Sequence, residues 1–163
     1  MKHTLLFPLF GLLLICGAAC KGEKGDTGPA GRDGSGAEDA LTQTVRNWTY
    51  AAPSWTANIL VPDITQAIVD QGAVLVYWKN PANQWAALPV TTYSLDWYTS
   101  TLDMTFAVGA VTVRKTDSDL TKPVDPGPQT FKIVTITGEG MVVYDDLDWA
   151  DYEVVADRLQ LPD

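Results

Sequence analysis

Histidine and cysteine are nearly missing from this chain of 163 residues. The single histidine is His3, and the two cysteines are Cys16 and Cys20. Everything after Cys20 therefore has no imidazole to act as a general base and no thiolate nucleophile. It also has no Cys or His ligand for a transition metal. These absences remove the common catalytic designs, so we expect no enzymatic activity and predict no catalytic residue.

Basic side chains are also scarce. The chain has 11 Lys and Arg against 20 Asp and Glu, a net charge of −9, and residues 37–163 alone carry a net charge of −10. We therefore expect no nucleic-acid partner, because binding phosphates needs a basic surface. The hydrophobic content of 46% is too high for a disordered chain and suits one soluble domain.

The first 19 residues have the pattern of a secretory signal peptide. Lys2 and His3 give a short basic start, residues 5–15 are mostly apolar, and the small residues 17–19 precede Cys20. The apolar run is too short for a transmembrane helix, which needs roughly 20 residues. We therefore predict a signal peptide over residues 1–19.

Small residues directly before a cysteine resemble the lipobox of bacterial lipoproteins. This resemblance implies that Cys20 carries acyl chains and begins the mature protein. The membrane would then be a partner through the lipid anchor, in the cell envelope at the outer membrane, facing the surface or the periplasm. More than one acyl chain is needed for stable attachment. The alternative is an ordinary secretory peptide cut near Ala19, which leaves a free thiol.

Glycine recurs at every third position over residues 22–36, in five triplets. This period is typical of collagen, because only glycine fits at the axis of the triple helix. We interpret residues 20–36 as the lipidated cysteine followed by a collagen-like spacer. The 15 residues of the triplets, if extended, would span about 47 Å at ~3.1 Å each. A single-chain tether is the favoured interpretation, and a triple helix joining a homotrimer is the alternative.

Residues 37–163 are predicted to form one β-rich head domain. Residues 73–78 are apolar on both alternating faces, which predicts a central strand covered on both sides. Polarity alternates over residues 102–108 and changes phase at Gly109, which indicates a tight hairpin or a bulge. The other expected strands are residues 44–50, 55–61, 85–90, the valines that follow Gly109, 130–137 and 141–144.

Two short helices interrupt these strands. Asp63 is expected to cap a helix over residues 64–70, and a second helix is expected over residues 150–159. Seven or eight short strands in a domain of this size predict an all-β fold, an antiparallel β-sandwich.

The whole assembly resembles a family of small bacterial surface lipoproteins. These have a short collagen-like repeat followed by a β-rich head of unassigned function. The resemblance implies surface display through a lipid anchor and supplies no catalytic residue. The head segments that carry it are residues 62–66, 72–77, 85–89, 116–120, 130–134 and 151–153.

An acidic run near the C-terminus offers a candidate metal site. Asp145, Asp146, Asp148 and Asp151 have the oxygen ligands that Ca²⁺ prefers, although the EF-hand spacing is absent. The alternative is that Asp148 or Asp151 caps the last helix, where negative charge favours the positive end of the dipole. We predict no cofactor and keep calcium as the alternative.

Six tryptophans offer a candidate ligand surface. Trp85, Trp97 and Tyr98 lie in or beside predicted turns and are expected to be exposed, whereas Trp78 is expected in the core. Exposed aromatic rings on a β-sandwich suit stacking against sugar rings. The sequence thus predicts a displayed binding or structural head with an extracellular glycan or protein ligand. The alternative function is a carbohydrate-binding module.

Overall fold

A computed structural model of the chain describes residues 37–94, 97–119 and 124–161. The predicted signal peptide, Cys20 and the glycine triplets lie outside the described residues. No helix in the described part of the chain is long and apolar enough to cross a membrane.

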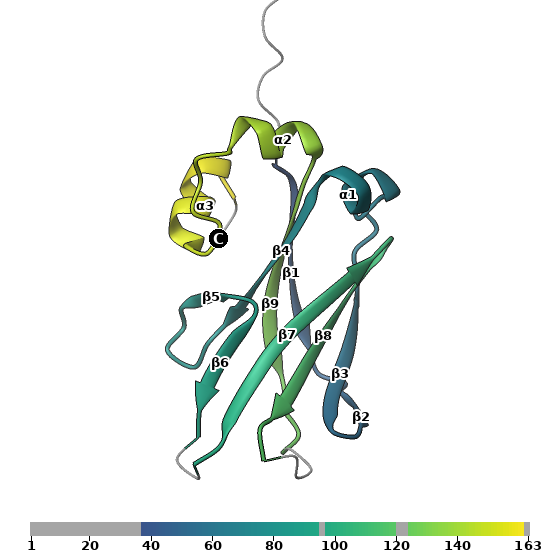
Figure 1. The fold of residues 1–163 in the computed structure, drawn as a ribbon, viewed down its shortest axis with the longest axis vertical. Helices are drawn as coiled ribbons and strands as arrows, with labels where there is room; N and C mark the ends of the chain where they lie inside the picture. The colour runs from purple at the N-terminus through teal and green to yellow at the C-terminus, as the bar shows by residue number, and fades with distance from the viewer. Residues whose placement is uncertain (1–36, 95–96, 120–123, 162–163) are drawn as a thin grey trace, which may run out of the picture. The chain divides into compact units, whose positions relative to one another are not determined.

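Two antiparallel sheets form a β-sandwich, which confirms the predicted fold class (Figure 1). One sheet has the strand order β1-β9-β4-β5, and the other has the order β2-β3-β8-β7-β6. In the described residues there are nine strands and three helices, so the expected seven or eight strands and two helices were too few. The elements are β1 (Ala37–Val45), β2 (Thr49–Ala51), β3 (Ser54–Leu60), α1 (Gln66–Gln71), β4 (Ala73–Lys79), β5 (Trp85–Ala87), β6 (Val90–Tyr93), β7 (Thr99–Ala107), β8 (Ala110–Asp117), β9 (Gln129–Ile136), α2 (Gly138–Val143) and α3 (Tyr152–Leu159).

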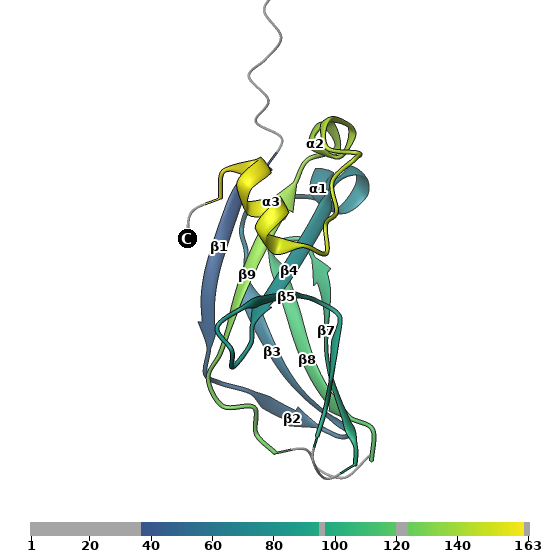
Figure 2. The ribbon, with the colours of Figure 1, turned by 90° about the vertical axis from the view of Figure 1, so that its left-hand side faces the viewer.

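Apolar side chains fill two separate layers. Between the two sheets, Val111 and Val113 of β8 pack in one cluster with Phe131 and Ile133 of β9. On the outer face of the four-stranded sheet, α3 covers a second cluster that includes Val134 of β9. Figure 2 shows α3 lying over β9 and β4. Strand β9 is therefore buried on both faces.

The expected central strand over residues 73–78 is confirmed as β4. Val74 and Val76 are buried in the cluster between the sheets, while Tyr77 is buried in the cluster under α3. The predicted hairpin at Gly109 is also confirmed, because Ala107 pairs with Ala110 and Gly109 has a φ of 78°. A positive φ is available to glycine at no steric cost.

Two expected strands prove to be pairs of shorter strands that switch sheets. The prediction of one strand over residues 44–50 was wrong, since β1 ends at Val45 and β2 begins in the other sheet at Thr49. Residues 85–90 likewise divide into β5 and the first residue of β6. Both sheets bury side chains in the same interior, so the alternation of polarity does not reveal where the chain changes sheet.

The helices differ from the predictions at three places. Residues 141–144 were expected to be a strand but lie mostly in α2, whose N-cap Thr137 accepts a hydrogen bond from the Gly140 amide at 3.2 Å. Thr65, not Asp63, caps α1, because fully buried Ile64 is held in the core before the helix begins. The last helix begins at Tyr152, with Asp151 as its N-cap. In α2, the cap at Thr137 favours a helix where the β-propensity of residues 141–144 had predicted a strand.

Only some of the apolar side chains that alternate over residues 102–108 are buried. Leu102 is buried and Met104 packs against the core, but Phe106 and Val108 are exposed. The sheet pairing explains the difference, since β6 pairs with β7 only from Thr99 to Leu102. Beyond that point the outer edge of β7 lacks a neighbour among the described strands.

Candidate functional site

The sandwich has two ends of different character. Ala37 pairs with Ile136 and Val45 pairs with Gln129, so β1 runs from the end that carries the helices to the opposite end. We call these the helix end and the loop end. The loop end contains residues 46–48, the β2–β3 connection, residues 94, 97 and 98 of the β6–β7 hairpin loop and the described parts of residues 118–128 (Figure 1).

The interior of the sandwich changes from apolar to polar toward the loop end. On β8, Val111 and Val113 face the interior, and the next two residues of the same face are Lys115 and Asp117. The same change occurs from Leu102 to Ser100 on β7. We call the residues on the inward face of the strands at this level the polar layer: Ser100, Lys115, Asp117 and Gln129, with the exposed Thr92 at its edge.

Hydrogen bonds connect much of this layer. The Lys115 ammonium lies 3.1 Å from Oδ1 of Asp117, and the Ser100 hydroxyl donates to the same oxygen at 2.7 Å. Asp117 is 3% exposed, so this ion pair is largely removed from water. Nearby, the Trp78 indole donates to the Gln129 side chain at 2.7 Å. Burying a charged pair has a large desolvation cost, even when the geometry is good.

A cavity of about 130 Å³ lies within the polar layer. On this measure one water molecule needs roughly 10–15 Å³, so the cavity has room for several waters or a small ligand. Its walls come from both sheets and from the β8–β9 connection. The lining residues are Trp78, Val90, Thr92, Ser100, Leu102, Lys115, Pro126 and Gln129.

The hairpin loop next to the cavity displays a tryptophan. Thr92 and Ser100 belong to the two strands that this loop joins, and the loop is closed by a bond from the Ser94 amide to the Tyr98 carbonyl at 2.9 Å. Trp97 is 99% exposed and has a φ of 67°. A left-handed backbone is unfavourable for a residue with a side chain, and full exposure gains nothing from burial. Trp97 therefore contributes little to the fold.

The three predicted aromatic ligand residues lie in different environments. Trp97 is exposed, as expected, and the adjacent Tyr98 is half-buried. Trp85 was expected to be exposed, but it packs on Tyr152 of α3 with ring centroids 5.5 Å apart. Trp85 lies on β5 in the four-stranded sheet, whereas the loop that carries Trp97 joins two strands of the five-stranded sheet. Trp85 therefore holds α3 against the sheet and is not grouped with the other two.

Lys132 is a buried lysine that was not among the predicted site residues. It lies on β9, is 1% exposed and donates to the Tyr152 hydroxyl at 2.6 Å. Its ammonium also lies 5.1 Å from the centroid of the Trp85 ring and 5.0 Å from that of Tyr152. Cation–π contacts of this kind strengthen when they are desolvated. The signal for it in the sequence is one lysine within the apolar residues 131–134.

The acidic run is arranged as turns and a helix cap. Asp148 accepts a hydrogen bond from the Ala150 amide at 3.0 Å, and Asp151 accepts one from the Glu153 amide at 3.0 Å. Asp145 and Asp146 are exposed. Within residues 37–94, 97–119 and 124–161, no group of three or more His, Cys, Asp or Glu side chains is placed to hold a metal ion. The capping role is confirmed for Asp151, and calcium gains no support.

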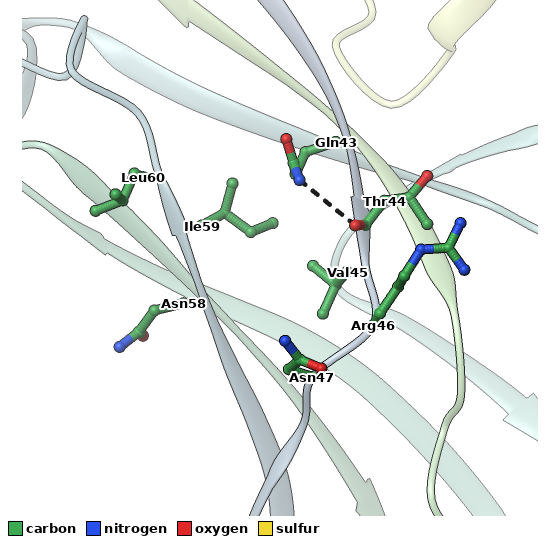
Figure 3. A pocket seen from close by; sticks show the side chains of 8 residues that line it. All are labelled: Gln43, Thr44, Val45, Arg46, Asn47, Asn58, Ile59 and Leu60. Atoms are coloured by element: carbon green, nitrogen blue, oxygen red, sulfur yellow. Dashed lines mark hydrogen bonds between the residues drawn. The ribbon is translucent and has the colours of Figure 1, made fainter.

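A second hollow follows the flank where the edges of β1 and β3 separate (Figure 3). It measures about 450 Å³ and is lined by residues 43–47 and 58–60. Within it, the Gln43 amide reaches only the neighbouring Thr44 carbonyl, at 3.4 Å. Its lining is mostly exposed and includes no buried charged group. The cavity in the polar layer, where partly buried polar groups from both sheets converge beside the buried Asp117, is the stronger candidate site.

No family model, curated protein or solved structure matches this chain.

The buried Tyr77 phenol predicts a loss of stability at alkaline pH. Burial raises the pKa of Tyr77 above its ordinary value of about 10, and Tyr152, Asp148 and Asp151 raise it further. The folded state therefore keeps a proton that the unfolded state releases. The stabilisation is complete below pH ~10 and is lost as the pH rises further. The phenol also donates to the Trp149 carbonyl at 2.9 Å.

We expect the free energy of unfolding, measured in urea from pH 8 to 11, to fall less steeply with pH in Tyr77→Phe than in the wild type. Tyr93→Phe is the matched control, since Tyr93 is 88% exposed. Equal pH slopes for Tyr77→Phe and the wild type would contradict the assignment.

Proposed function

We propose that this protein is a lipid-anchored bacterial surface protein whose head acts by binding and not by catalysis. Two features of the sequence support the anchor: the lipobox-like residues before Cys20 and the glycine triplets after it. The triplets serve as a tether that holds the head away from the outer membrane, and a homotrimer is the alternative arrangement. The absence of His and Cys from residues 37–163 supports a non-catalytic head.

The observation that carries the binding role is Trp97. An indole that is 99% exposed on a left-handed backbone is unfavourable for folding, so its presence is best explained by a ligand. Trp97 also lies at the loop end of the domain. A head attached through Ala37 is attached at the helix end, so the loop end is the end farther from the attachment point.

Replacing Cys20 with alanine tests the anchor. In Cys20→Ala we expect the protein to move from the membrane fraction to the soluble fraction, because the acylated thiol is removed. Cys16→Ala is the matched control and should stay in the membrane fraction. Fractionation followed by mass spectrometry of the N-terminal peptide measures both effects. Membrane association of Cys20→Ala at the level of the wild type would refute the lipid anchor.

A second candidate function, carbohydrate binding, is favoured by the same tryptophan together with the polar layer. Sugar rings have an apolar face that stacks on an indole and hydroxyl groups that need polar partners. An exposed Trp97, on the hairpin loop that joins two of the cavity's lining strands, together with the polar groups that line the cavity, supplies both kinds of contact.

Trp97→Ala tests this candidate on an array of bacterial and host polysaccharides. Tryptophan anchors at binding sites commonly contribute about 2 kcal/mol or more, so the affinity should fall at least tenfold. The melting temperature should not change, since the side chain is exposed. Leu60→Ala, which alters an exposed apolar residue at the helix end, should leave binding intact. Wild-type binding that survives Trp97→Ala would exclude this surface.

A further inference from the structure

We propose that the cavity in the polar layer binds one uncharged sugar unit, so that the head recognises the end of a glycan chain. The inference rests on the carbohydrate-binding function proposed above and names the part of the ligand that enters the protein. Four observations support it: the convergence of the lining residues, their remaining hydrogen-bonding capacity, the balance of charge and the position of Trp97.

The lining residues come together from six parts of the fold. Trp78 of β4 and Gln129 of β9 belong to the four-stranded sheet, while β6, β7 and β8 of the five-stranded sheet provide the opposite wall. Pro126 closes the side at the β8–β9 connection. Apolar walls with a few converging polar groups are the usual composition of a small-molecule site.

The polar lining groups keep hydrogen-bonding capacity toward the cavity. The Ser100 hydroxyl donates to Asp117, and the Thr92 hydroxyl donates to the Ser100 carbonyl at 3.3 Å. Each of these hydroxyls still has lone pairs that accept. Lys115 has three N–H donors, and its contacts with Asp117 involve a single carboxylate. A ligand hydroxyl both donates and accepts, so it complements this mixture of groups.

The charges of the cavity favour a neutral ligand. Lys115 and Asp117 lie 3.1 Å apart and cancel each other. A ligand carboxylate directed at Lys115 would compete with Asp117 for the same ammonium. A ligand ammonium would face Lys115, since Asp117 is not among the lining residues. Either charge would also have to be desolvated, which costs several kcal/mol. Neutral hydroxyl groups avoid both costs.

The position of Trp97 extends the site beyond the cavity. Thr92 lines the cavity on β6, and the hairpin loop that bears Trp97 begins only two residues later. A chain whose terminal unit occupies the cavity therefore has an exposed indole within the adjoining hairpin loop as a second contact. The cavity selects the terminal unit, and the indole stacks on a following unit.

Saturation-transfer NMR on the full chain in detergent micelles tests the proposal. The probes are the methyl glycosides of glucose, galactose, mannose and N-acetylglucosamine, with glucuronic acid and glucosamine as charged counterparts. We expect transfer to at least one neutral glycoside and weaker transfer to the charged sugars. Thr92→Val keeps the shape of the side chain but removes the hydroxyl, and it should weaken binding of the neutral glycoside at least tenfold.

Thr91→Val is the matched control for Thr92→Val. Thr91 is the neighbouring residue on β6, but its hydroxyl pairs with Thr101 at 3.0 Å on the outer face of the sheet, so binding should not change. Ser100→Ala gives a second test inside the cavity, should Thr92→Val fold poorly. Trp97→Ala should weaken binding of a polysaccharide more than binding of a single glycoside.

Three results would overturn the inference, and they separate it from the proposed function. Equal affinities for Thr92→Val, Ser100→Ala and the wild type, with polysaccharide binding lost in Trp97→Ala, would leave the binding head intact and exclude the cavity. A preference for a charged sugar would exclude the neutral ligand. No transfer to any probe and no polysaccharide binding would refute carbohydrate recognition together with the cavity, while the lipid anchor is still decided by Cys20→Ala.

Discussion

The fold depends on one strand, β9, which is buried on both of its faces. Phe131 and Ile133 pack between the sheets, and Val134 and Ile136 pack under α3. A strand in this position must present apolar groups in both directions, as strands covered on both faces commonly do. Lys132 is the exception, and it is retained because Tyr152 and Trp85 surround its ammonium. The same three side chains therefore attach α3 to the sheet.

This arrangement restricts where the head can bind. With α3 over the four-stranded sheet and the interior closed by apolar side chains at the helix end, the polar layer and its cavity are confined to the loop end. The apolar side chains that continue each strand toward the helix end provide the stability that the polar layer does not. A buried ion pair contributes little to stability by itself, and hydrophobic residues of similar volume often serve equally well. Departures from a consistent core of this kind are typical of functional sites.

Much of the architecture was accessible from local patterns. The alternation of polarity predicted β7, the aromatic and β-branched composition predicted β3 and β9, and the double-sided apolar run predicted β4. The glycine at the phase change predicted a hairpin or a bulge, and the structure has the β7–β8 hairpin. Asp151 was anticipated as a helix cap, and Trp97 as an exposed ring. Each of these features depends on neighbours in the sequence, which is why one sequence is enough to find it.

The features that were missed depend on register between distant segments. Lys115 looks like an ordinary surface residue until its pairing with Leu102 places it on the inward face. Trp85 beside a turn looks exposed until α3, more than 60 residues later, covers it. Residues 141–144 have the composition of a strand, but in the structure they have no sheet position to occupy, and Thr137 caps a helix there instead. Contacts between segments distant in the sequence thus determine which residues form the candidate site.

If the polar layer serves a ligand and not the fold, removing its polar groups should not destabilise the head. The free energy of unfolding tests this in a variant that combines Ser100→Ala, Lys115→Met and Asp117→Leu, determined in urea beside the wild type. Because apolar residues would replace a buried ion pair and its hydrogen-bonded hydroxyl, we expect the free energy of unfolding to be unchanged or to rise by about 1–4 kcal/mol. A fall of several kcal/mol would contradict it, since the polar layer would then be part of what holds the sandwich together.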